Sequence, residues 1–229
     1  MAKKNRSGKR FKEAEKLVDR SKTYTLKEAV AVLKTMPKPK FDESIELAFN
    51  LKIDVKKADH MVRGTVVLPH GTGKKVSVVV FCKGEQEKEA KAAGADYVGA
   101  QELMDKVAGG WMDFDSVVAT PEMMRDLSKL GKVLGPRGLM PSPKTGTVTQ
   151  NVAKAVSDLK AGKVEFKADK QGGVHVAVGK MSFGEEKIYE NASLLMSTLT
   201  AAKPASVKGD FIKSVSICTT MGPGLRIAV

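Results

Sequence analysis

The sequence predicts an α/β protein of two domains, one of which is inserted into the other. Three observations support this prediction. Residues 44–53 alternate apolar and polar side chains, as a strand with one buried face does. Residues 76–81 form a nearly continuous apolar run followed by alternating helix and strand signals, as in a parallel sheet covered on both faces. Most of the net charge of +13 lies outside this second region.

Composition indicates a folded protein without a membrane-spanning segment. The 229 residues allow one large core or two smaller ones, and 42% hydrophobic residues are ordinary. No apolar run approaches the roughly 20 residues of a membrane helix, and the N-terminus lacks an apolar signal core. We therefore expect a cytoplasmic protein with no membrane partner. Cys82 and Cys218 lack a partner motif and are expected to be thiols in a reducing compartment.

The positive charge is concentrated at the two ends of the chain. Residues 1–40 hold 13 Lys or Arg against 4 Asp or Glu, and residues 159–229 hold 10 against 6. Residues 41–67 hold 4 against 5, and residues 68–158 hold 12 against 11. This distribution favours a polyanionic partner over a charge that serves only solubility.

The N-terminal region predicts an arm followed by two helices. Residues 2–12 form a basic arm that we expect to be flexible until a partner binds. A short helix is expected over residues 12–18. Thr25 and Glu28 form a capping box ahead of an apolar run, and Pro37 ends the helix that follows.

The two ends of the chain also contain four strand signals. Besides residues 44–53, residues 163–169 and 174–178 flank a Gly-rich turn and predict a β-hairpin. Residues 211–219 roughly alternate and then run into Thr-Thr-Met-Gly-Pro-Gly, where Gly and Pro end a regular ladder. The resulting bend is either a site held by a rigid strand or a plain surface turn.

A long helix is expected between the hairpin and the last strand. Ser182 and Glu185 make a second capping box, and the helix ends just before Pro204. The strands and helices together predict an antiparallel-leaning α+β domain built from residues 1–67 and 159–229.

Residues 68–158 predict a small doubly wound parallel sheet, because strands and helices alternate throughout. Residues 120–121 supply an N-cap and a first-position Pro, and Gly131 closes that helix. The adjacent chain crossings near residues 67–69 and 159–162 predict a hinge. The expected strands are residues 76–81, 97–98 and 117–119, and the expected helices are residues 85–93, 100–108 and 120–131.

No motif supports an enzyme. Gly71-Thr72-Gly73-Lys74-Lys75 looks like a phosphate loop, but Leu68 stands at the earlier Gly position and Lys75 at the magnesium-binding Ser or Thr. The segment also precedes a strand, so a basic Gly-rich turn is the better interpretation. The histidines and cysteines share no metal-ligand spacing, and no cofactor is expected. A nucleotide-dependent α/β enzyme is kept as the alternative hypothesis.

Two further features bear on nucleic-acid binding. Residues 131–144 are dense in Gly, Pro and basic residues and predict a long loop, which either has a function or only covers the sheet. Aromatic residues are 5% of the chain, too few for base-stacking platforms. Their scarcity favours recognition of structured RNA through phosphate, sugar and shape.

Seven stretches of the sequence carry a family resemblance: residues 40–44, 63–66, 68–71, 93–96, 113–115, 134–141 and 219–222. They resemble the bacterial large-subunit ribosomal protein one family. The resemblance spans nearly the whole chain in the same order, and it implies a discontinuous domain plus an inserted Rossmann-like three-layer α/β domain. It also implies a protein that is a monomer when free, binds the mobile side-stalk ribosomal RNA near the exit site, assists release of deacylated tRNA and represses its own operon mRNA.

The resemblance further implies an RNA-binding surface in the terminal domain. This surface would combine polar strand faces with the bend after the last strand, where Gly lets the backbone approach ribose closely. Ser44 stands where some relatives carry Thr and keeps the hydroxyl. The implied RNA-binding residues are Lys40, Phe41, Ser44, Glu46, Lys167, Lys170, Gly172, His175, Ser214, Thr219, Thr220, Met221 and Gly222.

Overall fold

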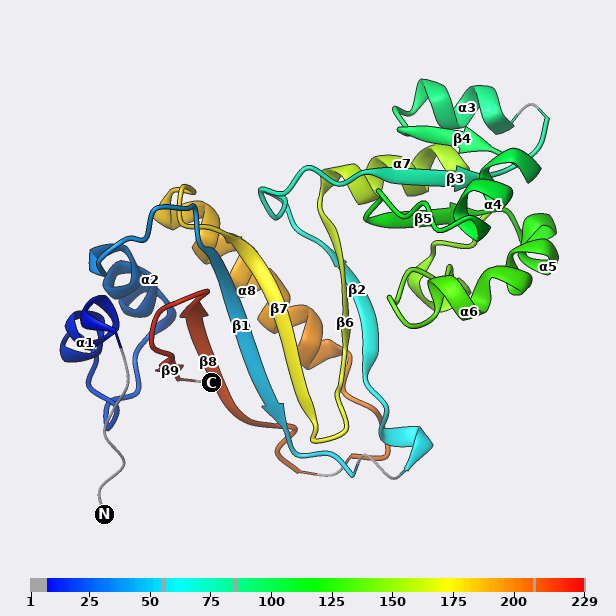
Figure 1. Ribbon diagram of the computed structural model, residues 1–229. Coiled ribbons are helices and arrows are strands. Elements are labelled where there is room, and N and C mark those ends of the chain that lie inside the picture. The colour runs from blue at the N-terminus through cyan, green and yellow to red at the C-terminus, as the bar shows by residue number, and fades with distance from the viewer. Residues whose placement is uncertain (1–7, 55–56, 85, 208, 229) are drawn as a thin grey trace, which may run out of the picture. The chain divides into compact units, whose positions relative to one another are not determined.

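The structure is a computed structural model that describes residues 8–54, 57–84, 86–207 and 209–228. Helices and sheets alternate along these residues, which confirms the mixed α/β class (Figure 1). Within the described residues, none of the helices is long and apolar enough to cross a membrane.

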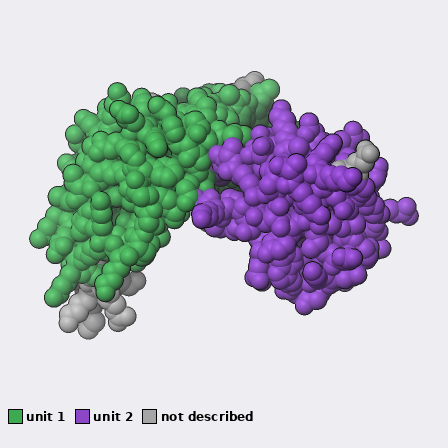
Figure 2. All heavy atoms as spheres, turned by 90° about the horizontal axis from the view of Figure 1, so that it is seen from above, with its two compact units in different colours: residues 1–73, 165–229 green, residues 74–164 purple. Residues whose placement is uncertain are grey.

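The chain divides into two compact units (Figure 2). Unit 1 comprises Met1–Gly73 and Glu165–Val229, and unit 2 comprises Lys74–Val164. Both divisions fall six residues later in the chain than the borders expected from the sequence, 67/68 and 158/159. Unit 1 holds 25 Lys or Arg against 15 Asp or Glu, and unit 2 holds 14 against 11, so unit 1 carries most of the positive charge.

Unit 1 is built on a four-stranded sheet of order β7-β1-β8-β9 (Figure 1). Each neighbouring pair is antiparallel, and β1 lies between β7 and β8. Leu47 on β1 pairs with Val176 on β7 and Ile217 on β8, and these three side chains are almost fully buried. The strands are β1 Ser44–Leu51, β7 Gly173–Lys180, β8 Ile212–Thr219 and β9 Leu225–Ile227.

Helices α2 (Leu26–Thr35) and α8 (Glu185–Ala201) pack against each other, and both contact this sheet. The predicted capping box of α2 is confirmed: the Thr25 hydroxyl accepts the N–H of Glu28, and the Glu28 carboxylate accepts the N–H of Thr25. The bond from the Thr25 N–H holds the pKa of Glu28 below its ordinary value. One face of the sheet is therefore buried under α2 and α8, and the sequence encodes the start of α2 locally.

The predicted hairpin is wrong, although both of its strands exist. β6 (Lys163–Lys167) pairs with β2 (Arg63–Val67) in a separate two-stranded sheet, whereas β7 pairs with β1. The turn between them does close, because the Asp169 N–H donates to the carbonyl of Gly173 at 2.8 Å. Alternation of apolar and polar side chains predicts a strand but does not determine which other strand it pairs with.

The second predicted capping box is also wrong. Helix α8 begins at Glu185 with Gly184 as N-cap and no side-chain cap. Ser182 instead donates its hydroxyl to Asp42 at 2.7 Å, and Asp42 also accepts the N–H of Ser182 at 3.0 Å. The distant carboxylate competes successfully for the hydroxyl that was expected to cap the helix.

The first helix begins earlier than expected. Helix α1 spans Lys9–Lys16 and follows Gly8, so residues 9–12 of the predicted flexible arm are helical. Ala14 is the buried residue of this helix. The remainder of the predicted arm, residues 2–7, lies outside the described residues.

Unit 2 contains the predicted parallel sheet, with order β4-β3-β5. Val79 and Phe81 of β3 face a core that includes helix α4, while Val78 and Val80 face helices α3 and α7. Helices on both faces give three layers, as a doubly wound sheet requires. The elements are β3 Val78–Phe81, α3 Gln86–Ala92, β4 Tyr97–Gly99, α4 Gln101–Ala108, β5 Ser116–Ala119 and α7 Val152–Ala161.

Three details of unit 2 differ from expectation. Gly131 does not close its helix, because its φ of −57° is helical and the chain stays helical to Leu134. The long loop therefore begins after Leu134 instead of at residue 131. Helix α7 was not predicted; Asn151 caps it by accepting the N–H of Lys154, so most of the expected crossing at residues 159–162 is helical. The short helical segments of unit 2 are η2 Pro121–Met123, α5 Met124–Leu127, η3 Ser128–Leu130, α6 Gly131–Leu134 and η4 Pro143–Thr145, and η1 Ala58–His60 belongs to unit 1.

Candidate nucleic-acid interface

The second face of the unit 1 sheet carries small and polar side chains. Opposite positions on β7, β1 and β8 form rows across this face, which we call the polar face. One row holds His175, Ala48 and Ser216, and the adjacent row holds Asn50 and Ser214 beside Gly173. Each of these side chains is half-buried or exposed. The period-two pattern of β1 therefore produces the expected division into a core face and a polar face.

The polar face ends at a junction between the start of β1 and the turn after β8. The Ser44 N–H donates to the Thr220 hydroxyl at 3.0 Å, and the Thr220 N–H donates to the Ser44 carbonyl at 3.0 Å. The Ser44 hydroxyl is also within 2.8 Å of the Lys180 ammonium. The hydroxyls of Ser44 and Thr220 thus hold the junction together, and Lys180 adds a positive charge beside it.

Glu43 stabilises this junction through contacts of its side chain and its backbone. The residue is only 3% exposed, and its carboxylate accepts the N–H of Met221 at 3.0 Å. Its carbonyl accepts the N–H of Met181 at 2.8 Å, so backbone and side chain both tie neighbouring segments to β1. Arg10 lies 3.6 Å from the carboxylate and supplies the opposite charge that a buried carboxylate needs.

Two large apolar side chains project from the junction into solvent. Phe41 and Met221 are each 53% exposed, a large fraction for such side chains in a folded protein. Gly222 is required beside them: a Cβ there would lie 2.4 Å from Oγ1 of Thr219. Thr219 itself is 3% exposed and lies on the core side, apart from the other predicted site residues.

The other end of the polar face is a shallow hollow beside the turn between β6 and β7. Asn50, His175, Ser214 and Ser216 are among the residues that line it. Asp169 also lines it, but its carboxylate is held in the turn by the N–H groups of residues 171 and 173, each at 2.7 Å. The bond from residue 173 contributes most to holding the pKa of Asp169 below its ordinary value.

Lys167 is the last residue of β6 and Lys170 lies in that turn, and both line a second hollow with His60 and Met61. Both lysines are exposed. Gly172 is buried, has a φ of +81° and leaves room for the carbonyl of Leu51, so it shapes the turn. Asp169 lines both hollows, so the basic side chains and the hydroxyls lie near the same turn.

The structure arranges most predicted site residues along one strip. Ser44 and Asn50 mark its two ends on β1 and lie roughly 20 Å apart at the rise of an extended strand. Glu46 lies between them, with Cys218 as its neighbour on β8. Burial, followed by the charge of Glu46, raises the pKa of the Cys218 thiol, which is therefore neutral at pH 7.

Sequence reasoning missed Lys180, Asn50 and Ser216 on this strip. Lys180 is opposite Ser44, and Ser216 is opposite Ala48. Lysine and serine are residue types suited to RNA binding, but only the pairing register shows that Lys180 and Ser216 lie on the polar face. The period-two pattern of β1 was a sufficient signal for Asn50.

A family model described as the Ribosomal protein L1p/L10e family matches residues 32–223. The chain belongs to this family. The family expected from the sequence is confirmed. The matched stretch includes every predicted site residue, from Lys40 to Gly222, and leaves out helix α1 and strand β9. Membership in the L1p/L10e family supports a structural role in the large ribosomal subunit, RNA binding and association with the ribosome.

Proteins of the L1p/L10e family are structural proteins and not enzymes. Among the described residues, no group of three or more His, Cys, Asp or Glu is arranged to hold a metal ion. The Gly71–Lys75 segment is a turn: the Gly71 carbonyl accepts from the buried amide of Asn191 at 2.9 Å, and Asn191 also accepts the N–H of His70. This turn precedes β3, as the sequence indicated.

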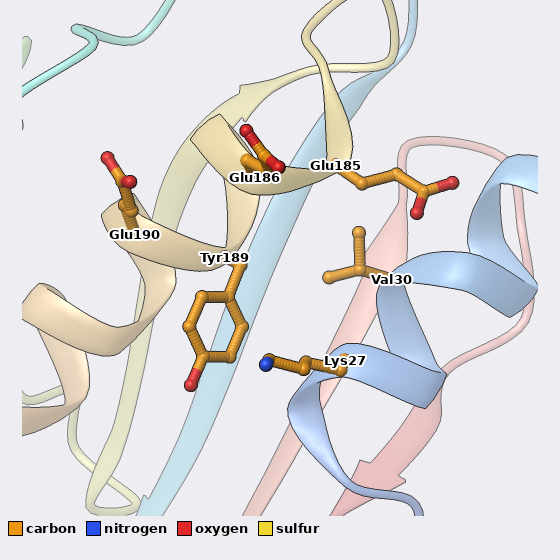
Figure 3. Close-up of a pocket in the computed structure, with 6 residues that line it drawn as sticks. All are labelled: Lys27, Val30, Glu185, Glu186, Tyr189 and Glu190. Atoms are coloured by element: carbon orange, nitrogen blue, oxygen red, sulfur yellow. The ribbon is translucent and has the colours of Figure 1, made fainter.

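The helical side of unit 1 has a different character from the polar face. Figure 3 shows a pocket between α2 and α8, where the Lys27 ammonium lies 5.3 Å from the centre of the Tyr189 ring. Glu185, Glu186 and Glu190 also line this pocket. Three carboxylates repel phosphate, so this side of an L1p/L10e protein is unsuited to RNA.

Proposed function

We propose that this L1p/L10e family member binds the mobile side-stalk RNA of the large ribosomal subunit through the polar face of unit 1 and its junction. The observation that carries the proposal is the convergence of exposed Phe41 and Met221 with the strip of hydroxyl and amide groups on β1, β7 and β8. Apolar side chains at one end exclude water, while polar groups along the strip bond the RNA.

The chemistry of the strip suits structured RNA. Glu46 is an acceptor on the polar face, and a ribose 2′-hydroxyl is a donor that DNA lacks. Ser214 and His175 offer donors to phosphate or sugar, and Lys167, Lys170 and Lys180 add positive charge at both ends. The net charge of unit 1 supplies the attraction that is independent of sequence.

Thr220 has a supporting role in this proposal. Its hydroxyl is already engaged with the N–H of Ser44 at 3.0 Å and lies 3.3 Å from the Ser44 carbonyl. Thr220 therefore keeps Ser44 and the Met221 turn in register, and the turn presents Met221 to the RNA.

The same face would serve two further activities. We propose that the protein assists release of deacylated tRNA at the exit site while bound to the stalk. We also propose that it represses translation of its own operon mRNA by binding a segment that imitates the stalk. Because one face serves both RNAs, the stalk RNA and the mRNA leader would exclude each other.

The test is a filter-binding assay with the full chain, labelled stalk RNA and unlabelled mRNA leader as competitor. The proposal predicts tight stalk binding and complete displacement by the leader. Stalk binding that persists at saturating leader would remove the repression mechanism. Tight nucleotide binding with no affinity for stalk RNA would overturn the proposal in favour of a nucleotide-dependent enzyme.

A further inference from the structure

Arg10 on helix α1 joins the two ends of the loop that carries Phe41. Its Nη1 atom donates to the carbonyl oxygen of Pro37 at 3.4 Å and lies 3.6 Å from Oε1 of Glu43. Pro37 and Glu43 bracket residues 38–42. A single guanidinium, with its rigid set of donors, therefore contacts both sides of this loop.

Glu43 links the same guanidinium to the second exposed apolar side chain. Oε1 of Glu43, which lies 3.6 Å from Nη1 of Arg10, also accepts the N–H of Met221 at 3.0 Å. The Glu43 side chain is 4% exposed and that of Arg10 is 31% exposed. A carboxylate buried to this degree is stable when it is both paired and hydrogen-bonded, and Arg10 and the Met221 N–H provide these two contacts.

We propose that Arg10 is a positioning residue for RNA binding. Through Pro37 and Glu43 it fixes the Phe41 loop and the Met221 turn in one arrangement before RNA arrives. Loops that must be ordered during binding lower the affinity, so fixing them beforehand raises it. This inference rests on the proposed function and adds a role for helix α1, which lies outside the stretch matched by the family model.

The test compares Arg10→Met with Arg20→Met in the full chain. Met keeps an unbranched apolar side chain and removes the charge. Arg20 is a matched control, because it carries the same charge in the same N-terminal region but pairs with Glu15 at the surface, at 2.5 Å. Affinity for stalk RNA is measured over a series of salt concentrations, and the amide NMR signal of Met221 is recorded without RNA.

The proposal predicts that Arg10→Met binds about three- to tenfold more weakly at every salt concentration, as expected when loop ordering moves into the binding step. The slope of log affinity against log salt should not change, because Arg10 contacts protein and not phosphate. The Met221 signal should shift in Arg10→Met and stay in place in Arg20→Met. Arg10→Lys restores the positive charge and should recover part of the affinity. Thermal melting confirms that all variants are folded.

Equal affinities of Arg10→Met and Arg20→Met would overturn the inference. A slope reduced by about 0.7–0.9 in Arg10→Met would overturn it as well, since that result means a direct phosphate contact. Loss of binding in Met221→Ala with none in Arg10→Met removes the inference and leaves the proposed function standing. A wild-type protein that does not bind stalk RNA overturns both.

Discussion

Gly222→Ala tests whether the turn after β8 must keep its present shape. The new Cβ would lie 2.4 Å from Oγ1 of Thr219, which is 3% exposed and cannot swing into solvent. Real Cβ contacts lie beyond 3.0 Å, so the turn or Thr219 must move by more than half an ångström. Overpacking of this kind costs about 1–3 kcal/mol. Since Met221 sits in the displaced turn, we expect affinity for stalk RNA to fall about tenfold.

The same turn provides its own control. Gly224→Ala adds the same methyl group where nothing lies within 4 Å and should leave affinity unchanged. Combining Gly222→Ala with Thr219→Ala removes the clashing oxygen and should restore much of the RNA affinity. The assay is a filter-binding titration, with circular dichroism to confirm folding. Wild-type affinity in folded Gly222→Ala, or no recovery in the double variant, would refute the steric argument.

Three other predictions concern the rest of the face. Thr220→Val leaves the Ser44 N–H without its acceptor, and we expect about 1 kcal/mol lower stability in urea unfolding together with weaker RNA binding at an unchanged salt slope. Lys167→Ala should reduce the slope of log affinity against log salt by the amount expected for the loss of about one phosphate contact. Folding lowers the pKa of Asp169 from 3.8, so its charged form stabilises the protein above about pH 4, and that contribution is lost as the pH falls through the lowered pKa. In unfolding titrations Asp169→Asn should therefore be less stable than wild type at pH 6 and approach it as the pH falls through that lowered pKa; a constant difference would contradict this.

The elements that the sequence predicted well are those whose signal is local. The alternation over residues 44–53 matches β1 and its two faces, and the Thr25 and Glu28 box gives the start of α2. The apolar run at residues 76–81 matches the buried strand β3 at the centre of a parallel sheet. In each case the residues that decide the structure lie within one turn or one strand of each other.

The features that were missed depend on partners far away in the chain. The Ser44 N–H meets the Thr220 hydroxyl across 176 positions, and Met221 meets Glu43 across 178. Ser182 bonds Asp42 instead of capping α8, across 140 positions. Such contacts depend on the register between strands, which side-chain alternation alone does not fix between distant segments. The family resemblance indicated the candidate site residues, and the structure showed which distant residues hold them in place.

The proposed function depends most directly on exposed Phe41 and Met221, which we propose form the apolar end of the RNA-binding face. The most direct measurement is the affinity for stalk RNA of Phe41→Ala and Met221→Ala, with Leu194→Ala as control. Leu194 is 38% exposed on α8, away from the polar face. We expect a loss of about tenfold or more for each of the first two variants, equivalent to about 1.4 kcal/mol, and none for the control. Wild-type affinity in both folded site variants, or an equal loss in the control, would contradict it.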